Sequence, residues 1–172
     1  MTEQQIKKTV DEIFQETDLL SIPVPIVDIA NYYGFPVYEL SMPENSSGLI
    51  ISGDKIIPSI NSQKAIAVNK DHSVQRRRFT IAHELAHYFL QGKPEVCYAH
   101  RDDGLYSEEE RQANSFASML LMPEDDIRRI AEKTKHTVPR WQFSEELIDA
   151  VRWSFNVSAK AAEVRLKKLK LL

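Results

Sequence analysis

The chain has 172 residues, of which 42% are hydrophobic and 27% charged, with a formal net charge of −3. These values are typical of one soluble globular domain with at most a small appendage, and they exclude a wholly disordered chain. The single cysteine, Cys97, excludes an internal disulfide framework and a four-cysteine zinc site. Apolar runs are too short to cross a membrane, and the charged N-terminus lacks the apolar stretch of a signal peptide. We therefore expect a cytoplasmic protein.

Periodic apolar residues predict helices over residues 3–17 and about 26–33, the second ending at Gly34. Strands are predicted at 35–40, 48–52, 55–57 and 65–69. From residue 73 the pattern is helical, with helices predicted over 73–91, 107–121, 123–134, 143–154 and 158–170. This order predicts a mainly helical α+β fold with a small sheet of three to four strands. We expect a catalytic domain over residues 1–136 and a C-terminal helical extension over 137–172.

The segment 83–87 reads His-Glu-Leu-Ala-His within a predicted helix. His83 and His87 are four residues apart, so they lie one turn apart on nearly the same face and can reach one metal ion. Glu84 lies between them and is placed to take a proton from water. The neighbouring apolar stripe of Ala82, Leu85, Ala86 and Phe89 predicts that one side of this helix is buried.

A catalytic zinc site needs a third protein ligand in addition to the two histidines. The other histidines, His72, His100 and His136, are candidates, and so is a carboxylate from the next helix. On that helix Glu109 and Glu110 each lie roughly 50° from the centre of the apolar face, on opposite sides. Helix geometry alone does not choose between them.

Two sequence segments carry a family resemblance. RRFTIAHELAHYFL, followed by E-x-x-A-N-x-F-A-x-x-L-L-M-P, resembles the ImmA/IrrE-type zinc metallopeptidases, and the resemblance extends over most of residues 20–172. It implies a zincin-like domain with one catalytic Zn²⁺, held by His83, His87 and Glu110, with Asn114 one turn beyond the third ligand. Ala86 is a departure, since relatives frequently carry glycine there.

The resemblance also implies a function. We expect a zinc-dependent endopeptidase that uses Glu84 as its base and cleaves a separate protein, a helix-turn-helix transcriptional repressor. A non-proteolytic module that binds a regulator through a structural metal site is the alternative, and a general aminopeptidase is a third possibility. The acidic balance of the chain disfavours direct nucleic-acid binding, although residues 141–170 resemble a helix-turn-helix in rhythm.

Several residues have less specific interpretations. Asn69 and the strand before it are expected at a sheet edge that could receive an extended peptide. The candidates for stabilising an oxyanion are Tyr88, Tyr98, His100 and Tyr106. Cys97 is expected to be a packed or surface thiol. The run Arg76–Arg78 is expected to form a solvated face.

Overall fold

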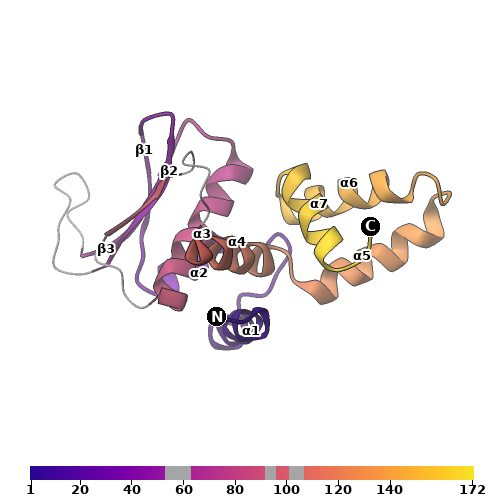
Figure 1. Cartoon of the computed structure of the whole chain (residues 1–172), viewed down its shortest axis with the longest axis horizontal. Helices are drawn as coiled ribbons and strands as arrows, with labels where there is room; N and C mark the ends of the chain where they lie inside the picture. Colours follow the sequence, from indigo (N-terminus) through magenta and orange to yellow (C-terminus); the bar gives the residue numbers. More distant parts are fainter. Residues whose placement is uncertain (53–62, 92–95, 101–106) are drawn as a thin grey trace.

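The computed structural model describes residues 1–52, 63–91 and 107–172, and the backbone of residues 96–100. Two helices precede a small sheet, and helices make up most of the rest of the described chain (Figure 1). The helices are α1 (Glu3–Thr17), α2 (Ile26–Tyr32), α3 (Val74–Gln91), α4 (Glu108–Leu121), α5 (Glu124–Thr137), α6 (Phe143–Phe155) and α7 (Ala159–Lys168). The strands are β1 (Val37–Leu40), β2 (Ser46–Ser52), β3 (Lys64–Asn69) and β4 (Val96–His100). The fold is α+β, as the sequence predicts.

The sheet has the strand order β1-β3-β2-β4. β3 runs parallel to β1 and antiparallel to β2, while β2 also pairs antiparallel with β4. The expectation that β3 and Asn69 form a sheet edge is wrong, because β3 is paired on both sides. Asn69 is instead buried, and its side-chain amide donates to the Ser46 carbonyl at 3.1 Å, which holds the connection between β1 and β2.

The fourth strand, β4, was not predicted from the sequence. Its sequence, Val-Cys-Tyr-Ala-His, does not alternate between apolar and polar residues, and its pairing with β2 is irregular between Ser46 and Leu49. The strand expected at 55–57 lies outside the described residues.

Helix α3 is the centre of the fold, because it packs against α4, α2 and the sheet strands β2 and β3. Every residue from Thr80 to His87 is buried. Gly48 of β2 permits the close approach of this helix. A Cβ atom at Gly48 would lie 2.5 Å from Thr80 Cγ2 and 2.7 Å from the Ala67 carbonyl oxygen. The predicted apolar stripe is confirmed, with Ala82, Leu85 and Ala86 fully buried.

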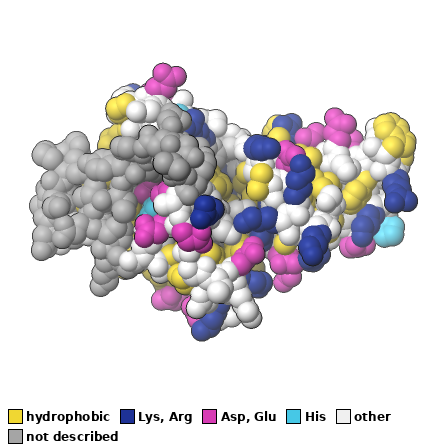
Figure 2. Space-filling model, in the orientation of Figure 1, with side chains coloured by type: hydrophobic (Ala, Val, Ile, Leu, Met, Phe, Trp, Pro, Cys, Tyr) yellow, Lys and Arg dark blue, Asp and Glu magenta, His cyan; other side chains and the backbone are white. Residues whose placement is uncertain are grey.

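Helices α5, α6 and α7 pack on one another at the end of the molecule away from the sheet (Figure 1). Ser158 caps α7, since its hydroxyl accepts a hydrogen bond from the Ala161 amide at 3.1 Å. Ala162 and Leu166 are buried, and Leu169 packs partly buried against the same core. Figure 2 shows many basic side chains on the visible surface of this region. Among the described residues, no helix has the length and apolar character needed to span a membrane.

Candidate metal site

Two neighbouring helices bring three metal-ligating side chains together. His83 and His87 lie one turn apart on α3, and both are at most 6% exposed. Glu110 comes from the first turn of α4, which Ser107 begins by accepting a hydrogen bond from the Glu110 amide at 3.1 Å. The packing of α3 against α4 therefore decides where the carboxylate lies relative to the imidazoles.

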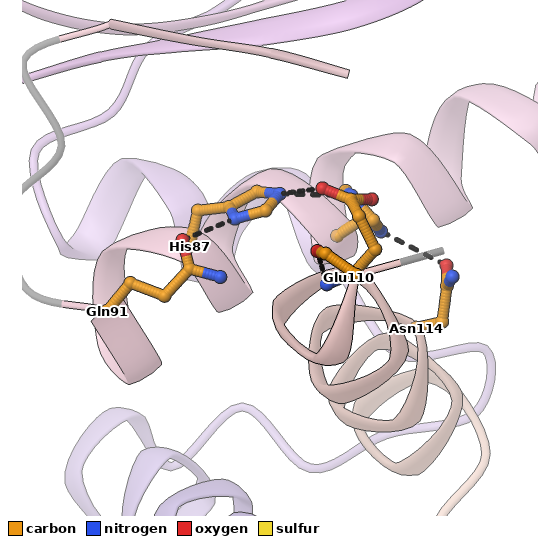
Figure 3. A network of polar contacts seen from close by, with 6 residues as sticks. His87, Gln91, Glu110 and Asn114 are labelled. Carbon is orange, nitrogen blue, oxygen red and sulfur yellow. Dashed lines mark hydrogen bonds and ion pairs between the residues drawn. The ribbon is translucent and has the colours of Figure 1, made fainter. Parts of the chain in front are cut away.

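The donor atoms of this cluster converge on one point. The Nε2 atoms of His83 and His87 are 3.1 Å apart. The carboxylate oxygens of Glu110 lie 3.2 Å from His83 Nε2 and 3.5 Å from His87 Nε2. Figure 3 shows Glu110 facing the His87 ring from the neighbouring helix. Among the described residues, this is the group of histidine and acidic side chains whose ligand atoms could hold a metal ion.

The spacing of these atoms fits a small tetrahedral ion. Nitrogen and oxygen ligands lie about 2.0–2.2 Å from zinc, so tetrahedral angles separate them by about 3.3–3.6 Å. The observed separations are 3.1 Å between the two Nε2 atoms, 3.2 Å from His83 Nε2 to Glu110 Oε2 and 3.5 Å from His87 Nε2 to Glu110 Oε1, each close to this range. Two imidazoles and one carboxylate also form a ligand set that leaves a fourth position open, as catalytic zinc requires.

Two amide side chains orient the imidazoles. Asn114 Oδ1 lies 3.1 Å from His83 Nδ1, and Gln91 Oε1 lies 2.8 Å from His87 Nδ1. Because an amide oxygen only accepts, each Nδ1 carries the proton and each Nε2 is left with a free lone pair. The two contacts come from opposite sides, as the labelled residues in Figure 3 show. Sequence analysis missed Gln91, although its position four residues after His87 on the same helix was a usable signal.

Burial favours the neutral form of His87, which is the form that binds metals. Desolvation is the main cause that lowers the pKa of His87 below the ordinary value of 6.5, and the nearby His83 acts in the same direction. The hydrogen bond that His87 donates to the Gln91 side-chain carbonyl oxygen and the Glu110 charge partly offset this effect. A neutral imidazole is the ligand form, so the low pKa favours metal binding. Glu84, between the two histidines in sequence, is fully buried.

The competing candidates for the third ligand whose side chains the structure describes do not join this cluster. Glu109 is exposed, and neither His72 nor His136 belongs to the group. The side chains of His100, Tyr98 and Cys97 and the whole of Tyr106 lie outside the described residues. Tyr88, a candidate for oxyanion stabilisation, packs edge-to-face on Phe35 with ring centroids 4.8 Å apart.

The arginine run before the histidines is structural, so the expectation of a solvated face is wrong. Arg78 donates to the Val24 carbonyl at 2.8 Å, and burial lowers its pKa. Arg76 donates to the Ser47 hydroxyl at 3.2 Å, and Arg77 pairs with Glu39. Sequence analysis could not foresee these contacts because each partner lies on a different, distant segment.

The fold and the donor cluster together are those expected of a metallopeptidase domain. A comparison with known families matches residues 30–167 to the peptidase M78 family, described as the IrrE N-terminal-like domain. The match covers most of the chain, and the protein belongs to this family. A comparison with curated proteins found no significant match.

Proposed function

We propose that this protein is a zinc-dependent endopeptidase whose metal ligands are His83, His87 and Glu110. The observation that carries the proposal is the convergence of the three side chains within 3.1–3.5 Å of one another. Membership of a peptidase family supports hydrolysis of peptide bonds as the reaction. A ligand set of two imidazoles and one carboxylate, which leaves a fourth position open, supports zinc as the ion.

The residues divide the chemistry between them. A zinc ion in this site would polarise the scissile carbonyl and lower the pKa of a water molecule. Glu84 takes the proton from the attacking water, whose oxygen forms a bond to the carbonyl carbon. As the C–N bond breaks, Glu84 returns that proton to the leaving amine. Asn114 and Gln91 hold the two imidazole rings so that both Nε2 atoms face the same point.

We further propose that the substrate is a separate helix-turn-helix transcriptional repressor in the cytoplasm. The support is the resemblance to the ImmA/IrrE-type peptidases, which extends beyond the His-Glu-x-x-His segment to the second motif on α4. The protein partner would be cut at a linker or domain junction, where an extended segment can enter the site.

The direct test is to incubate the zinc-loaded protein with the repressor encoded beside its gene and to follow cleavage by mass spectrometry. We expect one cut with the wild type and none with Glu84→Gln. Glu109→Gln is the matched control, because this exposed neighbour of Glu110 should leave cleavage unchanged. An intact repressor in every sample under inducing conditions would contradict the proposal.

The same variants separate the alternatives. A non-proteolytic regulator-binding module predicts that Glu84→Gln keeps the regulatory phenotype while His83→Ala abolishes it, because only the metal would matter. A general aminopeptidase predicts rapid removal of N-terminal residues from short peptides. A regulatory endopeptidase should have little of that activity, which a chromogenic amino-acid anilide measures directly.

A further inference from the structure

A cavity of about 540 Å³ lies beside the candidate metal site, between α3, α4 and α7. Residues from all three helices line it. They include Arg76, Phe79, Asn114, Ser118, Lys160 and Lys168. Asn114 belongs to both places, because its Oδ1 contacts His83 Nδ1 at 3.1 Å while the residue also lines the cavity. The cavity therefore lies next to His83, on the Nδ1 side of the imidazole, whereas Nε2 faces Glu110 and His87.

Helix geometry places the cavity residues on the turns of α3 and α4 that neighbour the metal ligands. Arg76 precedes His83 by seven residues, which places it about 20° away around α3 and about 10 Å along it. On α4, Asn114 and Ser118 follow Glu110 at intervals of four residues, so they share its side of the helix. The metal ligands and the cavity thus occupy successive turns of the same two helices.

The lining of the cavity is strongly cationic. Arg76, Lys160 and Lys168 line it, and no acidic side chain does so within the described part of the chain. Two of these basic side chains donate hydrogen bonds to neutral hydroxyl groups. Arg76 donates to the Ser47 hydroxyl at 3.2 Å, and Lys168 donates to the Ser115 hydroxyl at 3.1 Å. Lys160 lies 3.4 Å from Glu163, which is outside the lining. Lys160 is therefore paired with Glu163, whereas Arg76 and Lys168 have no acidic partner in the described lining of the cavity.

Two residues of the cavity lining have side-chain atoms without a hydrogen-bond partner among the described residues. The Ser118 hydroxyl and the Arg76 Nε atom are buried and have no hydrogen-bond partner among the described residues. Both residues belong to the cavity lining, which therefore has polar as well as charged members. Phe79 and Val164 add apolar surface beside them. This combination suits a side chain that has both a carboxylate and an aliphatic stem.

We propose that this cavity is a specificity site of the proposed peptidase that binds an aspartate or glutamate side chain of the substrate. The inference rests on the proposed function, because the occupant is part of the peptide being cut. An extended peptide rises about 3.3 Å per residue, so a distance of about 10 Å corresponds to about three residues from the cleaved bond. Arg76, Lys160 and Lys168, which line the cavity, supply the positive charge that attracts this carboxylate.

Binding to capped nonapeptides tests this without requiring turnover. The peptides contain alanine and leucine with one glutamate at each position in turn, and each has a glutamine counterpart. The N-terminus is acetylated and the C-terminus amidated, so the glutamate side chain is the single carboxylate of the peptide. Zinc-loaded Glu84→Gln protein is titrated by fluorescence anisotropy. We expect the best glutamate peptide to bind about fivefold or more tightly than its glutamine counterpart at low salt, and 0.5 M NaCl should reduce this preference.

Charge-reversal variants test whether the cavity lysines cause the preference for glutamate peptides. Lys160→Glu combined with Lys168→Glu in the same background should abolish the glutamate preference. Lys133→Glu is the control, because it reverses an exposed charge on α5 that does not line the cavity. Equal affinity for glutamate and glutamine peptides, or an equal loss of preference in the control, would overturn the inference.

Cleavage of a proteome-derived peptide library by the wild type separates this inference from the proposed function. Cuts enriched for aspartate or glutamate within two to four residues of the broken bond support both. Cuts without that enrichment, together with no binding preference, refute the specificity site and leave the peptidase intact. A binding preference without any cut of the library or the repressor refutes the peptidase and leaves the carboxylate-binding site.

Discussion

Removal of the Asn114 amide should weaken zinc binding without removing a ligand. Asn114 Oδ1 accepts the hydrogen bond from His83 Nδ1 at 3.1 Å, and His83 is only 6% exposed, so water cannot readily replace the lost partner. In Asn114→Ala the imidazole can rotate or move its proton to Nε2. Loss of such orienting contacts typically costs about 10- to 100-fold in metal affinity, which corresponds to about 1.4–2.7 kcal/mol.

The assay is competition for zinc with a chromogenic chelator at pH 7.5. Asn114→Asp retains an oxygen acceptor and should bind zinc at least as tightly as Asn114→Ala, and closer to the wild type. Asn31→Ala, a change at an exposed position on α2, should leave the affinity unchanged. The reasoning is refuted if Asn114→Ala, shown to be folded by circular dichroism, binds zinc as tightly as the wild type.

Two further predictions concern the stability of the folded protein. Gly48→Ala should lower stability by about 1–3 kcal/mol, because its Cβ would meet Thr80 and the Ala67 carbonyl; an unchanged Tm would contradict this. Burial, and then the Glu16 carboxylate bonded at 2.8 Å, raise the pKa of Tyr33 above its ordinary value of 10.0. The unfolded chain therefore loses this proton first, and stability falls as pH rises above 10. Urea unfolding at pH 9 and 11 should show a smaller fall in Tyr33→Phe than in the wild type or in Tyr32→Phe.

The part of the site that sequence analysis predicted is the part encoded within one helix. His83, Glu84 and His87 need only the period of α3 to be placed, and the buried stripe around them follows the same period. The third ligand depends on how α4 packs against α3. Helix geometry therefore left Glu109 and Glu110 open, and the resemblance to a family pointed to Glu110. In the structure Glu110 lies in the cluster and Glu109 is exposed.

The sheet was less predictable, since its order depends on partners distant in sequence. The strands around residues 37–40, 46–52 and 64–69 were found from local patterns. The expected edge position of Asn69 was wrong because β1 pairs with β3 rather than with its sequence neighbour β2. The arginines before the histidines were similarly misjudged. Nothing in the run Arg76–Arg78 indicates that a carbonyl near residue 24 and a hydroxyl on β2 receive two of their side chains.

Metal analysis of the purified protein tests the central claim most directly. After dialysis against zinc-free buffer, the wild type and Glu109→Ala should each retain about one zinc ion per chain, as expected for a site with three protein ligands. Glu110→Ala and His83→Ala should retain far less, because each loses a ligand. Zinc lost from Glu109→Ala but kept by Glu110→Ala would show that the carboxylate ligand has been assigned to the wrong residue, and a metal-free wild type after zinc loading would contradict the site itself.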